Sequence, residues 1–125
     1  MVRIIYEYAQ EWPIEGPLTV DARLQGVITI PPDTARRRTN GYFAQEIALF
    51  IVAGEPVLVM GEPSVWHIPA ILRLRGFGEV ATVGSLNVNA HTGEPLPLTT
   101  EQIEAIRKRA NELAVRFTPT TETPV

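Results

Sequence analysis

Apolar residues recur at helical spacing through the middle of the chain. The run that follows Pro31-Pro32-Asp33-Thr34 repeats every three to four residues, so we predict one amphipathic helix that ends before Gly54. Asp33 is expected to cap its first turn, and Gly41 to mark a close packing contact. The predicted buried stripe consists of Ala35, Thr39, Tyr42, Phe43, Ile47, Phe50 and Ile51.

After Gly54 the pattern changes to the alternation that is typical of strands. Residues 56–60, 65–74 and 80–90 are β-prone and are separated by short segments rich in Gly and Pro, which predicts an antiparallel meander. Pro69 has no N–H group to donate, so we expect its strand to lie at an edge or to meet a bulge there. An edge strand would also be able to accept a strand from a partner.

The remaining segments complete the prediction of the fold. Residues 2–8, 18–24 and 26–30 favour strands, and a second helix is expected from Thr99, with Gln102 completing a capping box and an apolar stripe that ends at Phe117. The predicted class is therefore α+β: an antiparallel β-meander packed against a central amphipathic helix and a C-terminal helix, with additional N-terminal strands. We expect a single domain over residues 1–117 and a disordered tail over residues 118–125.

Composition narrows the class of protein. The 125 residues contain no cysteine, which excludes disulfides and thiolate metal ligands, and the formal net charge of −3 gives no overall attraction to nucleic acid. No signal peptide and no apolar run of about 20 residues are evident, so a soluble, cytoplasmic protein without membrane contact is expected.

Arg36, Arg37 and Arg38 are the most unusual feature, because they place cations at the start of a helix, where the dipole favours anions. One interpretation is a binding site for an anionic or acidic partner surface; the alternative is a solvated face paired with acids such as Glu46. Trp66 is the second candidate binding residue, with core packing and a partner for its indole N–H as the alternative. A further basic group, 107–109, is expected to pair with neighbouring acids on its own helix.

The sequence suggests no catalytic or metal-binding set. His67 and His91 lack the spacing of metal ligands, and Ser64 and Ser85 lie outside any nucleophile motif. We therefore expect no enzyme activity, no metal and no cofactor.

Two resemblances add expectations about partners. The segments 35–40, 54–59, 65–69 and 87–94 resemble an uncharacterised family of short bacterial proteins, over a region that extends from Ile28 to Leu96. Members of such families often accompany toxins, which implies an antitoxin-like role. Residues 86–94 are also similar to the strand and Thr-Gly-Glu turn of PepSY-type domains, which are regulatory or inhibitory modules.

The predicted function is a noncatalytic protein-binding module that uses Arg36 to Arg38 or an open sheet edge. Its partner would be another protein or a second copy of the chain. Two alternatives stay open: a nucleic-acid binding module that uses both basic groups, and a small-molecule-binding protein or enzyme with a polar pocket near Trp66 and His67.

Overall fold

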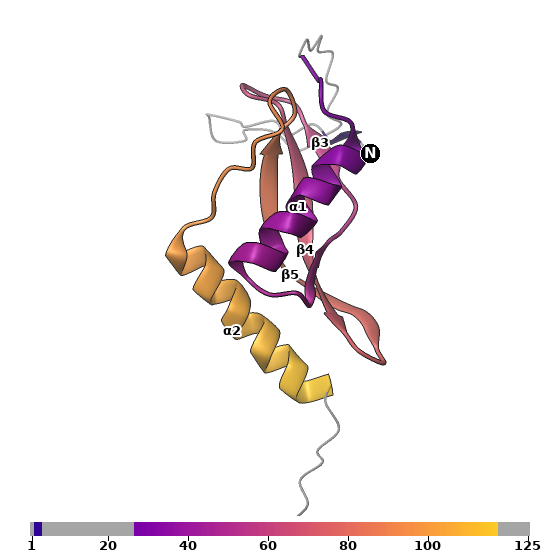
Figure 1. Ribbon diagram of the computed structural model, residues 1–125, viewed down its shortest axis with the longest axis vertical. Coiled ribbons are helices and arrows are strands. Elements are labelled where there is room, and N and C mark those ends of the chain that lie inside the picture. Colours follow the sequence, from indigo (N-terminus) through magenta and orange to yellow (C-terminus); the bar gives the residue numbers. More distant parts are fainter. Residues whose placement is uncertain (1, 4–26, 118–125) are drawn as a thin grey trace, which may run out of the picture.

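The computed structural model describes residues 2–3 and 27–117 of the chain, and Figure 1 shows how they are arranged. Within these two ranges, two helices and five strands follow one another along the sequence. Their bounds are β1 Val2–Arg3, α1 Pro32–Glu46, β2 Ile51–Ala53, β3 Val57–Val59, β4 Val65–Leu74, β5 Gly78–Asn89 and α2 Thr100–Phe117. The fold is α+β, as predicted, with helices packed on a largely antiparallel sheet.

The long strand β4 organises the sheet. On one side it pairs with β5 along its whole length, and on the other it pairs with β3 at its start and with β2 at its end, all antiparallel. The strands β3, β4 and β5 therefore form the predicted meander. β1 adds to the outside of β3 in parallel, with Val2 opposite Leu58.

Pro69 explains why β2 and β3 are two strands instead of one. The N–H of Gly54 donates to the carbonyl of Pro69 at 2.8 Å, but proline has no N–H to return the bond, and the ladder is interrupted between β2 and β3. The prediction of an edge at Pro69 was wrong, because β4 is paired on both sides, whereas the expected irregularity is present as a register shift between β4 and β5 at Ala70 and Ile71, next to Pro69.

The central helix is shorter than predicted. It ends at Glu46, and Ile51 belongs to β2, so the expectation of a helix up to Gly54 was wrong. Ile51 and Val52 are β-branched, which favours a strand. As a strand they pair with β4, and this pairing would be lost if the helix continued through them. Asp33 makes no side-chain cap: the N-cap residue is Pro31, and Pro32 begins the helix with its backbone angle already helical.

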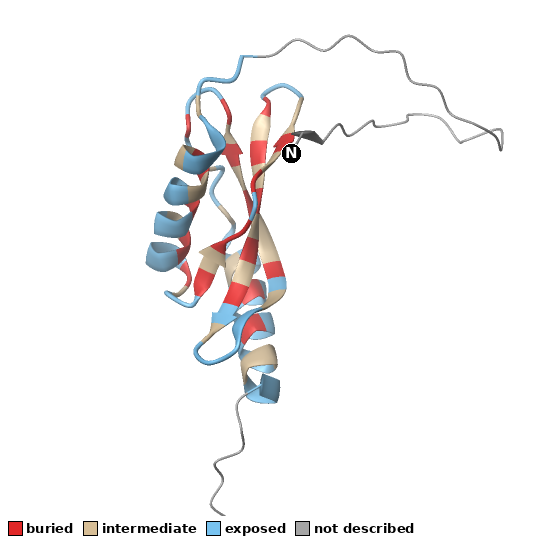
Figure 2. Cartoon of the chain, turned by 90° about the vertical axis from the view of Figure 1, so that its right-hand side faces the viewer, coloured by how far each residue is buried: buried red, intermediate tan, exposed pale blue. Residues whose placement is uncertain are grey.

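One continuous core lies between α1 and the sheet. Ala35, Thr39 and Phe43 are the buried residues of α1, and the buried side chains of β4 alternate along the strand at 66, 68, 70 and 72. Figure 2 shows α1 along one side of the sheet, with its buried residues turned inward and its exposed residues outward. Gly41 lies on the exposed side, and a Cβ atom added to it would meet no atom within 4 Å, so the expected close contact there is absent.

The second helix begins as predicted. The N–H of Thr99 donates to the Oε1 of Gln102 at 2.9 Å and the N–H of Gln102 donates to the Oγ1 of Thr99 at 3.1 Å, which is a reciprocal capping box. Ile106 of this helix reaches Gly84 of β5, where a Cβ atom would lie 2.7 Å from its side chain. Gly84 is the register partner of buried Ala70, so both residues point to the same face of the sheet. α2 therefore covers the face of the sheet on which the core lies.

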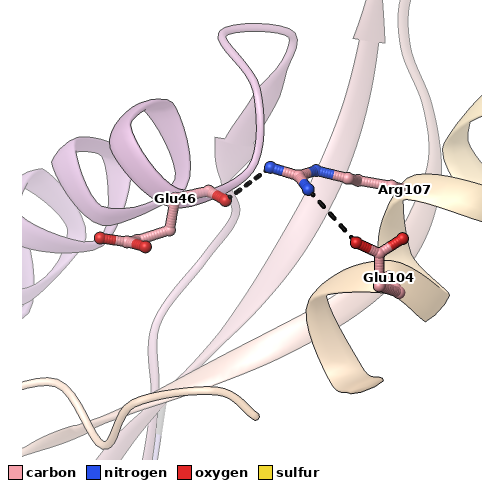
Figure 3. Close-up of polar contacts among 3 residues, drawn as sticks. All are labelled: Glu46, Glu104 and Arg107. Atoms are coloured by element: carbon pink, nitrogen blue, oxygen red, sulfur yellow. Dashed lines mark hydrogen bonds and ion pairs between the residues drawn. The ribbon is translucent and has the colours of Figure 1, made fainter. Parts of the chain in front are cut away.

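Arg107 joins the two helices. Its Nη2 donates to the backbone carbonyl of Glu46 at 3.0 Å, and its Nη1 lies 3.5 Å from the Oε1 of Glu104 (Figure 3). The contact between Arg107 and Glu104 is the one ion pair within residues 27–117, and the predicted pairing of Lys108 with its neighbours does not form.

Other predictions fall at the limits of the described residues. The predicted strand 26–30 is irregular from 27 onwards, although the N–H groups of Thr29 and Ile30 both donate to the carbonyl of Ala90 at 2.9 Å. The strand 18–24, most of the strand 2–8 and the tail 118–125 lie outside the described residues. Neither described helix is long and apolar enough to cross a membrane.

Candidate functional site

The predicted arginine site is largely used by the fold. Arg36 donates from Nε to the carbonyl of Ala53 at 3.2 Å, and Arg38 donates from Nη1 to the carbonyl of Gly93 at 2.9 Å. Arg37 is exposed and makes no hydrogen bond or ion pair with the residues that the structure describes. Two of the three arginines therefore have a structural reason for their position, which helix electrostatics alone did not supply.

The contact between Arg38 and Gly93 ties the first half of α1 to the turn after β5. Gly93 is buried and has a φ of +77°, a conformation that side chains rarely adopt, and a Cβ atom there would collide with the guanidinium group. The cation lies against backbone carbonyls and has no carboxylate partner among the described residues, so its positive charge is solvated but not neutralised.

The arginine and asparagine side chains of α1 also close the outer edge of β2. Asn40 accepts a hydrogen bond from the N–H of Ala53 at 2.7 Å, while Arg36 donates to the carbonyl of the same residue. On the other side of the sheet, residues 94–96 pair with the outer edge of β5 around Val88. The edges near the start of α1 are therefore occupied, which removes them as places for an added strand.

Trp66 lies in the core, with 7% of its surface exposed, and its indole N–H donates to the carbonyl of Ile30 at 2.8 Å. His67 follows it in the strand and points to the opposite face, where its Nδ1 lies 2.8 Å from the Oδ1 of Asn87. The structure thus does not bring Trp66 and His67 into one pocket. His91 contacts Thr29, and residues 27–117 contain no group of three potential metal ligands.

Among the described residues eight large apolar side chains are exposed, and four of them lie at the end of the molecule opposite the start of α1. They come from the connection between α1 and β2, from the turn between β4 and β5, and from the last residue of α2; Figure 1 shows this turn and the end of α2 at the lower end of the molecule. The exposed fractions are 83% for Leu49, 43% for Phe50, 52% for Phe77 and 40% for Phe117. We call these four residues the apolar end.

Phe77 and Phe117 are in direct contact, and Leu49 and Phe50 lie beside the two neighbours of Phe77. The rings of Phe77 and Phe117 meet edge to face, with their centroids 5.9 Å apart. Leu49 and Phe50 line an open depression together with Gly76 and Gly78, the two neighbours of Phe77. The N–H of Arg73 donates to the carbonyl of Phe50 at 2.9 Å, which fixes the connection against the hairpin.

Arg73 and Arg75 border the apolar end. Both line the same depression as Leu49 and Phe50, and among the described residues no acidic side chain lines it. Glu79 lies opposite Arg73 in the register of the two strands, but the two side chains do not form an ion pair. The charged lining of the depression is therefore basic.

The sequence reasoning missed this surface because it assigned Phe50 and Phe117 to buried helical stripes. Periodicity continues through Phe50 although the helix stops at Glu46, and Phe117 lies at the last position of α2, beyond the sheet. Phe77 was the available signal: it stands between Gly76 and Gly78 in a hairpin turn, and a turn has little core to bury an aromatic ring against.

Comparisons with family models, with curated proteins and with solved structures found no match to this chain.

Proposed function

We propose that the protein is a noncatalytic module that binds another protein through its apolar end. The observation that carries the proposal is the gathering of four exposed apolar side chains, three of them Phe, beside two arginines. Single exposed apolar residues are ordinary on protein surfaces, but a contiguous group is typical of an interaction site. Aromatic residues and arginine are also the types that interfaces favour and that contribute most to binding.

The apolar end is also held in place before any partner arrives. The backbone bond from Arg73 to Phe50 and the contact between the rings of Phe77 and Phe117 fix three separate segments relative to one another. A preorganised surface loses less conformational entropy when it binds, so more of the contact energy appears as affinity. An antitoxin-like role, in which the partner is a toxin, is one form of this proposal.

Nucleic-acid binding through the two basic groups is the weaker proposal. Arg36 and Arg38 already donate to backbone carbonyls, and Arg107 bridges the two helices, so three of the six cations have contacts inside the fold. The remaining three are divided between two helices, with Arg37 on α1 and with Lys108 and Arg109 on α2.

The test is a comparison of partners captured from the native host by the protein and by a Phe77→Ser variant. A partner that the protein retains and the variant loses supports the proposal. Leu96→Ser is the matched control, because Leu96 is also an exposed apolar residue, at 43%, and lies on the connection before α2. Equal recovery of every partner by the protein and the Phe77→Ser variant would contradict the proposal.

A further inference from the structure

The charged side chains that line the depression at the apolar end are of one sign. Arg73 and Arg75 are exposed at the depression, and within residues 27–117 neither guanidinium group has a hydrogen-bond or ion-pair partner. Arg116 precedes Phe117 in the last turn of α2 and is also exposed. The acids of this region lie outside the depression: Glu79 borders the neighbouring depression at the outer edge of β2 together with Leu49 and Arg73, Glu46 is the last residue of α1, and Glu112 lies one turn before Arg116. The charged lining of the depression is therefore basic, in a chain whose net charge is −3.

Two copies of the chain would not pair well through this surface. A symmetric dimer places the same patch on both sides, so the arginines of one copy would approach those of the other around the shared apolar contact. Like charges that face each other at an interface disfavour association. The occupant that matches the surface must supply carboxylates.

We infer that the apolar end recognises a segment of another protein in which Asp or Glu residues flank apolar side chains. This inference rests on the proposed function. The apolar side chains of the segment contact Leu49, Phe50 and Phe77, and its carboxylates pair with Arg73 and Arg75. Guanidinium groups suit this role because they hold a carboxylate with two parallel hydrogen bonds.

The test uses a library of random peptides, each about 12 residues long, displayed on phage and selected against the full chain. We expect the selected peptides to be enriched in Asp and Glu next to Leu, Phe or Trp. A synthetic copy of the most frequent peptide should bind at least about tenfold more weakly to the double variant Arg73→Glu, Arg75→Glu. The matched control, Arg37→Glu with Arg109→Glu, has the same net charge and reverses two exposed arginines elsewhere, so it should bind like the original protein.

A second double variant, Leu49→Ser with Phe77→Ser, separates this inference from the proposed function. If selected peptides lose binding to this variant but lack acidic residues, or bind the Arg73 and Arg75 variant unchanged, the apolar end is a binding surface and the inference of an acidic partner is wrong. If binding is indifferent to all of these changes, the proposed function fails as well. Circular dichroism of each variant shows whether it is folded.

An anionic membrane is the competing occupant, since aromatic and basic side chains also suit lipid headgroups. Vesicles of phosphatidylcholine with and without phosphatidylserine test it directly. Sedimentation of the protein with the phosphatidylserine vesicles, lost in the Phe77→Ser variant, would overturn the inference in favour of lipid. We expect no sedimentation with either kind of vesicle.

Discussion

At the end of the molecule where α1 begins, long polar side chains reach the backbone of distant segments, whereas at the other end aromatic side chains stay in solvent. Arg36, Arg38 and Asn40 connect α1 to β2 and to the turn at Gly93. At the apolar end, most of the surface of Leu49 and about half of the surface of Phe77 are exposed. The first end is built for internal stability, because its polar groups satisfy one another. The second leaves apolar surface that the fold itself does not use, and this is the difference that an interaction site requires.

The largest expected effect contrasts Trp66 with Phe77. Replacement of buried Trp66 by Ala removes a core side chain and the bond to Ile30, so we expect the free energy of unfolding to fall by about 3–5 kcal/mol. Phe77→Ala removes an exposed ring and its contact with Phe117, for which we expect a loss of about 1 kcal/mol or less. Urea denaturation followed by circular dichroism measures both. Similar losses for the two variants would mean that the apolar end is part of the core.

Gly93→Ala tests the packing of Arg38 on the turn. The methyl group would displace the guanidinium group and would force a backbone with φ of +77° on an alanine, so we expect the free energy of unfolding to fall by about 1–3 kcal/mol. The control is Gly76→Ala, which has a positive φ but no atom within 4 Å of its Cβ position. An equal loss at both positions would show that backbone conformation alone, without Arg38, accounts for the effect.

Arg38→Ala and Arg37→Ala separate a structural arginine from a free one. Loss of the hydrogen bond from Arg38 leaves the carbonyl of Gly93 without this donor, and we expect a decrease of about 1 kcal/mol in the free energy of unfolding. Arg37 makes no contact of this kind with the described residues, so its replacement should change the value by less than about 0.5 kcal/mol. A larger effect at Arg37 than at Arg38 in thermal unfolding would reverse this assignment.

The smallest expected effect is a gain in stability, from the replacement of Gly41 by Ala. Gly41 lies on the exposed side of α1 with open space around its Cβ position, so Gly41→Ala should raise the free energy of unfolding by about 0.5–1 kcal/mol. A shift of the midpoint to higher urea concentration checks it. A loss of stability would indicate that the close packing expected from the sequence does exist at this position.

Alternation and capping signals predicted the larger part of the fold. The bounds of β4 and the capping box at Thr99 were predicted correctly, because each depends on residues close together in the sequence. The end of α1 was predicted wrongly, because residues 47–53 are apolar throughout and fit a helix as well as a strand. Pairing with β4, which lies further along the sequence, decides between them, and no local pattern records that pairing.

The candidate site depended even more on distant contacts. Arg36 to Arg38 stood out in the sequence because their charge opposes the helix dipole, yet their partners at Ala53 and Gly93 are known only once the chain is folded. The apolar end joins residues 49–50, 77 and 117, each of them ordinary when taken alone. The hairpin brings them together, because Phe77 contacts Phe117 of α2 and the N–H of Arg73 donates to the carbonyl of Phe50.

Amide hydrogen exchange, measured with the captured partner bound and absent, shows whether the partner covers the apolar end. We expect slower exchange over residues 49–50, 75–78 and 115–117 in the complex, with no change at the start of α1. Protection centred on residues 36–38, with none in the hairpin turn, would contradict it.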